Sequence, residues 1–156
     1  MEVRADVHLD ASPERVFEVL MDPACLEHWV TAHRKIAKAP EGPLEKGSTF
    51  KQKLRVAGVA FSVIWEVTKL DAPRLAEWEG KGPAGSRARA VYKLEPDGDG
   101  TLFHYTNEWQ LPGGKIAAAA GKAIGEDLAR SEAEKSLENL ESFLGSSGSR
   151  TDSQEG

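Results

Sequence analysis

A glutamine and an asparagine lie on strand positions whose neighbours two residues away are apolar, so both side chains are expected to point into the protein. Gln52 alternates with Leu54, and Asn107 alternates with Tyr105. A buried amide without a hydrogen-bond partner costs about 1–3 kcal/mol, so each amide must bond to the other, to a tyrosine hydroxyl, to water or to a ligand. With Tyr92 on the same side, these residues predict an apolar pocket with a polar region. A cluster satisfied by water is the alternative.

The tryptophans add large flat surfaces to this pocket. Strand parity points Trp65 and Trp78 into the same space, and Trp29 reaches it from a short helix. Such side chains suit a flat or long apolar ligand, although they also fill the cores of small domains, which is the favoured interpretation for Trp109. The predicted ligand site consists of Trp29, Gln52, Leu54, Trp65, Trp78, Tyr92, Tyr105, Asn107, Ala120 and Ile124.

Few residues suggest catalysis or metal binding. Cys25 precedes His28 by three residues, but no acid is placed to orient the histidine, so a core cysteine is favoured. His28 and His33 lack a third ligand, and no metal site or cofactor is predicted. The segment 80–85 is rich in glycine but lacks the spacing of a phosphate-binding loop. No pair of carboxylates is placed for acid–base chemistry.

The longest predicted element is a helix over 112–144. Its second half carries an apolar stripe at Ala129, Ala133, Leu137, Leu140 and Leu144. Its first half is rich in small residues and carries a different stripe, Ala117, Ala120, Gly121, Ile124 and Leu128, that is rotated by about 160°. This rotation predicts either that the helix is kinked near 121–125 or that its first half contacts another part of the protein on a different side. The small side chains leave room between the helix and a sheet, although alanine is also simply a good helix former.

The segments before this helix predict strands and two short helices. Ser12 caps a helix that begins with Pro13. A second short helix is expected over 26–29. Apolar alternation and turn-forming residues predict antiparallel strands over 3–9, 33–39, 48–56, 59–70, 74–79, 87–95 and 101–111. One sheet and one long helix imply a sheet that curls around the helix. The fold class is therefore α+β, with a curved antiparallel sheet of six to seven strands.

Composition excludes several classes of protein. The 156 residues and 40% hydrophobic content predict one globular domain over 1–144, followed by a disordered polar tail over 145–156. The net charge of −5 argues against a nucleic acid or a polybasic membrane surface as the main partner. A single cysteine, no signal-peptide pattern and no long apolar run predict a cytoplasmic protein without stable membrane insertion. A monomer or weak homodimer is expected.

Several motifs resemble one known superfamily. The segment DASPERVFEVLMDPACLEHW resembles the opening of START-like (SRPBCC, birch-pollen-allergen-like) proteins, in particular the polyketide cyclase/dehydrase and lipid-transport branch. The segments GPLEKGSTF, WEVTKLDAPRLAEW, GTLFHYTNEW and KSLENLESFL are also similar. The resemblance implies a helix-grip fold with an elongated cavity for an apolar ligand.

This resemblance leaves three functions open, because fold alone does not choose among them. The first is the binding, for carriage or sequestration, of a hydrophobic molecule such as a lipid, a fatty acyl chain or an aromatic polyketide. The second is an aromatase/cyclase or dehydratase that uses the same cavity, which a titratable group inside it would favour. The third is an interaction module of the Hsp90-activator kind, which a collapsed cavity and a large exposed apolar patch would favour.

Overall fold

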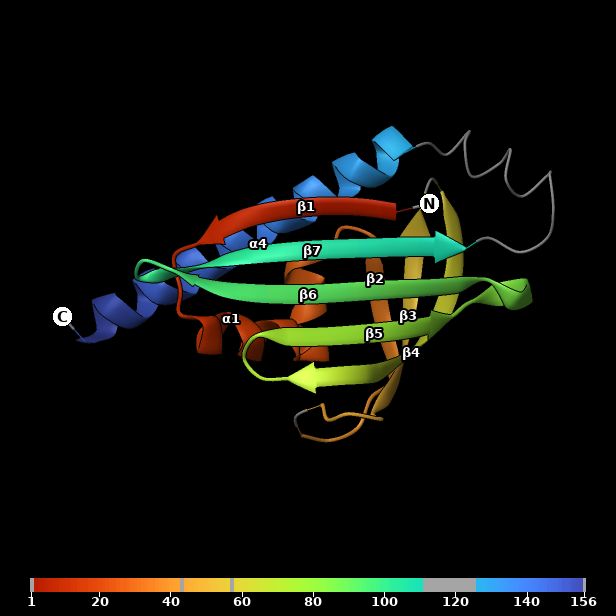
Figure 1. The fold of residues 1–156 in the computed structure, drawn as a ribbon, viewed down its shortest axis with the longest axis horizontal. Helices are drawn as coiled ribbons and strands as arrows, with labels where there is room; N and C mark the ends of the chain where they lie inside the picture. The colour runs from red at the N-terminus through yellow and green to blue at the C-terminus, as the bar shows by residue number, and fades with distance from the viewer. Residues whose placement is uncertain (1, 43, 57, 111–125, 156) are drawn as a thin grey trace.

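The chain forms a curved sheet that covers three helices on one side (Figure 1). The computed structural model describes residues 2–42, 44–56, 58–110 and 126–155. In chain order the elements are β1 Glu2–Leu9, α1 Pro13–Leu20, the 3-10 turn η1 Pro23–Cys25, α2 Leu26–Trp29, β2 His33–Lys38, β3 Thr49–Val56, β4 Val59–Asp71, β5 Leu75–Lys81, the 3-10 turn η2 Pro83–Gly85, β6 Arg87–Asp97, β7 Gly100–Gln110 and α4 Glu126–Glu155.

All seven strands belong to one antiparallel sheet with the order β1-β7-β6-β5-β4-β3-β2. Consecutive strands from β2 to β7 pair as hairpins, and β1 returns to pair with β7 at the far edge. In Figure 1, β2 and β3 stand nearly upright whereas β5, β6, β7 and β1 run across the view, which shows how strongly the sheet is curved. The expected helix-grip α+β architecture is confirmed.

Local sequence signals place the helices. The Ser12 side chain accepts a hydrogen bond from the Arg15 backbone N–H at 3.2 Å, and Pro13 occupies the first turn of α1. Asp22 begins η1 in the same way, accepting from the Ala24 N–H at 3.0 Å. The apolar side of α1 is buried against the sheet, where Val16 is fully covered.

Helix α4 is held by its apolar stripe and by hydrogen bonds to the segment after α2. Leu137, Leu140 and Leu144 are buried, as the stripe predicts. The Ser136 hydroxyl accepts from the Thr31 backbone N–H at 3.1 Å, and the Asn139 amide donates to the Trp29 carbonyl at 3.3 Å. These bonds connect residues far apart in sequence and fix the helix beside the site.

The ends of α4 differ from the sequence prediction or lie outside the described residues. The helix continues to Glu155, whereas a disordered tail is expected from residue 145. Once a helix has formed, each added residue brings its own hydrogen bond, so the backbone can continue past the last apolar contact, here Leu144. The expected kink near 121–125 lies outside the described residues. No described helix is long and apolar enough to cross a membrane.

Candidate functional site

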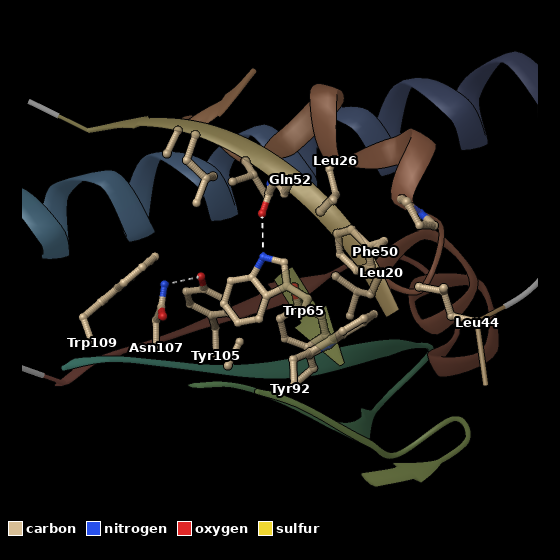
Figure 2. A pocket seen from close by; sticks show the side chains of 16 residues that line it. Leu20, Leu26, Leu44, Phe50, Gln52, Trp65, Tyr92, Tyr105, Asn107 and Trp109 are labelled. Carbon is tan, nitrogen blue, oxygen red and sulfur yellow. Dashed lines mark hydrogen bonds between the residues drawn. The ribbon is translucent and has the colours of Figure 1, made fainter. Parts of the chain in front are cut away.

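A partly open cavity lies between the concave face of the sheet and the first helices (Figure 2). Its volume is about 80 Å³, and the empty space between the lining side chains, counted with the open side, is about 650 Å³. The lining is mainly aromatic and aliphatic. It comprises Leu20, Pro23, Leu26, Val30, Ala32, Leu44, Phe50, Gln52, Leu54, Trp65, Trp78, Ala90, Tyr92, Tyr105, Asn107 and Trp109.

Most of the residues predicted from the sequence meet in this cavity. Seven of the ten line it, namely Gln52, Leu54, Trp65, Trp78, Tyr92, Tyr105 and Asn107. Trp29 does not, contrary to expectation. It is 1% exposed and packs edge-on against Tyr92 and Tyr105, because the short helix α2 presses the indole onto the tyrosine rings. Ala120 and Ile124 lie outside the described residues.

Gln52 is the centre of a hydrogen-bond chain across the cavity wall. Its Oε1 accepts from the Trp65 indole N–H at 2.9 Å, as Figure 2 shows, and its Nε2 lies 2.8 Å from His33 Nδ1. An indole nitrogen only donates, so Oε1 must be the acceptor and Nε2 the donor. His33 Nδ1 therefore accepts, which places the proton of the neutral imidazole on Nε2. Burial lowers the pKa of His33, which favours this neutral form.

Asn107 is only half satisfied. Its Nδ2 donates to the Tyr105 hydroxyl at 3.0 Å, and its buried Oδ1 has no partner among the described residues. The Tyr105 oxygen accepts this bond and still carries its own proton, for which no acceptor is found in the described part of the chain. Among the described residues the pair therefore holds one unpaired acceptor and one donor proton without an acceptor, and the acceptor oxygen has less than 1 Å² exposed, so a ligand reaches it only if the Asn107 side chain turns. The Trp78 indole N–H, on another lining residue, is also unpartnered there.

The ionisable groups in the lining are tyrosines that keep their protons. Burial raises the pKa of Tyr105 to about 12, against a smaller lowering by the Asn107 hydrogen bond. Burial, and then the neighbouring Tyr105, hold the pKa of Tyr92 well above its ordinary value. Both phenols are neutral at physiological pH and can therefore donate a hydrogen bond to a ligand. Among the described lining residues there is no carboxylate, lysine or histidine to act as a base.

Cys25 and His28 do not form a catalytic pair. Desolvation, with the nearby Asp22 carboxylate, raises the pKa of the Cys25 thiol to about 11, so the thiolate is disfavoured. The thiol donates to Asp22 at 3.7 Å. The His28 ring instead stacks on Phe143 with 4.6 Å between centroids. No group of three or more His, Cys, Asp or Glu side chains that could hold a metal is found within the described ranges.

Trp109 lines the cavity, so the core-filling role favoured for it from the sequence is wrong. Sequence reasoning also missed the part of the lining that comes from helices and loops. Leu20 and Leu26 come from α1 and α2, and Leu44 comes from the segment before β3. The apolar face of α1 is visible in the sequence, but its direction over the sheet depends on the turn at Asp22. Leu44 follows no strand or helix period, so no sequence pattern identifies it.

His33 makes the unfolding free energy depend on pH in a predictable direction. Its folded-state pKa lies below its unfolded value of about 6.5, so the unfolded chain binds the proton first as the pH falls. Stability contributed by neutral His33 is therefore present above about pH 6.5 and decreases as the pH falls below it. We expect the stability difference between the wild type and His33→Asn to shrink between about pH 8 and 5 in urea titrations. A difference that is constant with pH would contradict the assigned bond.

Gly80 has no side chain, and the Trp65 indole packs where a Cβ atom at residue 80 would lie. A Cβ atom at residue 80 would lie 2.6 Å from Val63 Cγ1 and 2.9 Å from Trp65 Cε3. We expect Gly80→Ala to lower the unfolding free energy by about 1–3 kcal/mol and to shift the tryptophan fluorescence. Gly145→Ala is the matched control, since nothing lies within 4 Å of its Cβ. It should leave stability unchanged or raise it by up to about 1 kcal/mol. Equal effects of the two substitutions would contradict the packing described.

Known proteins resemble this chain in sequence or in structure. The chain is 22% identical over 140 residues to Toxin Rv0910 of Mycobacterium tuberculosis, covering 89% of this chain and 94% of that protein. Its structure is similar to that of TTHA0849 from Thermus thermophilus, with a TM-score of 0.77, 21% identity and coverage of 94% and 99%. It is also similar to the Aha1 dimer from Colwellia psychrerythraea, with a TM-score of 0.61, 19% identity and coverage of 92% and 96%.

At these identities the two structures establish a common fold. The family evidence is broader. The sequence model of the SRPBCC-type family described as "Polyketide cyclase / dehydrase and lipid transport" matches residues 1–144, which include every strand and most of α4. The chain therefore belongs to the polyketide cyclase/dehydrase and lipid transport family.

Proposed function

We propose that the cavity binds, and so carries or sequesters, one hydrophobic small molecule with a polar group at one end. The observation that carries this proposal is the Asn107–Tyr105 pair, which offers an unpartnered acceptor and an unpartnered donor inside an aromatic lining. An alcohol, a phenol or a protonated carboxylic acid both donates and accepts, so each of these groups would satisfy the pair. A carboxylate only accepts and would leave the Asn107 oxygen unpaired.

The lining is suited to a flat aromatic or acyl body. Burial of apolar surface contributes about 25 cal/mol per Å², before the cost of immobilising the ligand. The cavity volume of about 80 Å³ is smaller than the ~150 Å³ of a cavity that holds benzene. A larger ligand must therefore extend through the open side of the cavity.

The two other functions fit the site less well. A cyclase or dehydratase needs a base close to the substrate, and the described lining offers only neutral phenols, amides, indoles and hydrocarbon. A collapsed cavity together with a large exposed apolar patch would favour an interaction module, and the cavity here is small, about 80 Å³, but partly open. The most exposed large apolar side chains in the described ranges are Val59, Ile64 and Leu128, and Leu128 lies on α4, apart from the other two on β4. We place the protein in the cytoplasm, as a monomer or weak homodimer.

Native mass spectrometry of the freshly purified protein tests this function. We expect an apolar adduct to co-purify and to disappear after mild organic extraction. Loading the extracted protein with candidate alcohols and acids should restore a one-to-one complex. Failure of every aromatic and acyl candidate to bind would contradict ligand binding and favour the interaction module.

A further inference from the structure

One end of the sheet gathers positive charge, although the chain as a whole is acidic. Strand register places Lys38, Lys51, Ile64, Lys81 and Arg87 in one row across the outer face of β2, β3, β4, β5 and β6. The row ends at Gln110 on β7 and contains no acidic residue. Beside it stand Lys35, Lys53 and Arg55. We call the seven cations the basic end: Lys35, Lys38, Lys51, Lys53, Arg55, Lys81 and Arg87.

These cations face one another rather than acidic partners. Lys35 is directly opposite Lys53, Lys38 is opposite Lys51, and Lys81 is opposite Arg87. Like charges at such positions destabilise a sheet. None of the seven forms an ion pair within the described part of the chain, whereas Arg89 in the next row pairs with Glu77 and Glu108. The basic end therefore lacks the neutralisation that its neighbouring row has.

The two hairpin tips at the basic end carry no charge. The β3–β4 tip reads Val-Ala-Gly-Val-Ala from residue 56 to 60, follows Arg55, and exposes 60% of Val59. The β5–β6 tip, Gly-Pro-Ala-Gly-Ser over 82–86, lies between Lys81 and Arg87 and contains η2, which contacts β4. Ile64, 51% exposed, lies in the row between Lys51 and Lys81. Small and apolar tips bordered by cations fit the interface of an anionic bilayer.

We propose that the basic end docks on an anionic lipid membrane, with the two hairpin tips at the headgroup boundary. An anionic surface relieves the repulsion among the cations, and the apolar tips gain burial that a nucleic acid backbone does not provide. The same end lies next to the cavity, because Phe61 beside the β3–β4 tip packs on Trp109 with 6.0 Å between centroids. In Figure 1 it is the end at which β7 terminates. If the proposed ligand binding holds, docking brings the cavity to a source of apolar molecules.

Vesicle co-sedimentation tests this docking without any cavity ligand. We expect binding to vesicles containing about 30 mol % phosphatidylserine, little binding to pure phosphatidylcholine, and release at about 0.5 M NaCl. Lys53→Glu combined with Lys81→Glu should weaken binding by at least about tenfold. The control, Lys46→Glu with Lys93→Glu, makes the same charge change at exposed residues away from the tips and should weaken it by less than about threefold.

A second variant separates docking from general charge and from folding. Val59→Asp should weaken vesicle binding by about tenfold, whereas Val59→Leu should preserve it, with unchanged circular dichroism in both. Three results would overturn the proposal. The two double variants could weaken vesicle binding equally, Val59→Asp could leave vesicle binding unchanged, or the protein could bind duplex DNA in preference to vesicles. Vesicle binding is measured without any cavity ligand. A positive result would therefore support membrane docking even if the proposed ligand binding failed.

Discussion

Replacing Asn107 by leucine is expected to impair ligand binding with little change in stability. The two side chains have the same branched shape, and leucine removes the buried oxygen that has no partner among the described residues. Removal of this unsatisfied group gains about 1–3 kcal/mol, but leucine also leaves the Tyr105 hydroxyl without the bond from Asn107, which costs about as much. We expect the free energy of unfolding in urea to change by less than about 1 kcal/mol and the affinity for a hydroxyl-bearing ligand to fall at least about tenfold.

The contrast between affinity and stability separates a binding residue from a structural one. If Asn107 served only the fold, leucine would lower the unfolding free energy and leave ligand affinity unchanged. Asn107→Ala provides a second variant, because it also removes the amide but leaves a small void. It should lose the same affinity and lower the unfolding free energy more than leucine does. Retained affinity in both variants would remove Asn107 from the site.

Replacing Gln52 by leucine is expected to lower the unfolding free energy clearly. Gln52 is 4% exposed, and both ends of its amide are bonded, to Trp65 and to His33. Leucine leaves the buried indole N–H and the imidazole nitrogen without partners, which should cost about 2–4 kcal/mol in urea unfolding. The Trp65 fluorescence should change at the same time, because its hydrogen bond is lost. A cost below about 0.5 kcal/mol would contradict the chain described.

Gln52→Glu is the matched control for this bond. A carboxylate still accepts from Trp65, but it can bond His33 only when the imidazole donates. The substitution should therefore raise the pKa of His33, so that the added stability is present at low pH and is lost as the pH rises through the raised value. This is the reverse of the wild-type dependence. The same pH profile in both proteins would contradict the contact between residues 33 and 52.

The parts of the structure that follow a simple period could be predicted from the sequence. Alternation along the strands predicts that Gln52, Trp65 and Asn107 lie on the concave face. This prediction can be made because a shift of one residue would turn every apolar side chain of the strand to the solvent. The stripe through Leu137 and Leu140 predicted how α4 faces the core. Both patterns arise from residues close together in sequence.

The remainder depends on long-range contacts that carry no period. The bond between His33 and Gln52 follows from the pairing of β2 with β3, which contains two register shifts. Trp29 lies behind the tyrosines because of the direction of α2, which its four residues do not encode. The basic end appears only when five strands are aligned, and for this reason the net charge of −5 concealed it.

Calorimetric titration with 2-naphthol and naphthalene tests the central claim most directly. The two molecules differ by one hydroxyl group, which can donate to Asn107 and accept from Tyr105. We expect 2-naphthol to bind the wild type at least about tenfold more tightly than naphthalene, and the difference to fall below roughly threefold in Asn107→Leu. Equal affinities in the wild type, or a preference that survives in Asn107→Leu, would contradict the account.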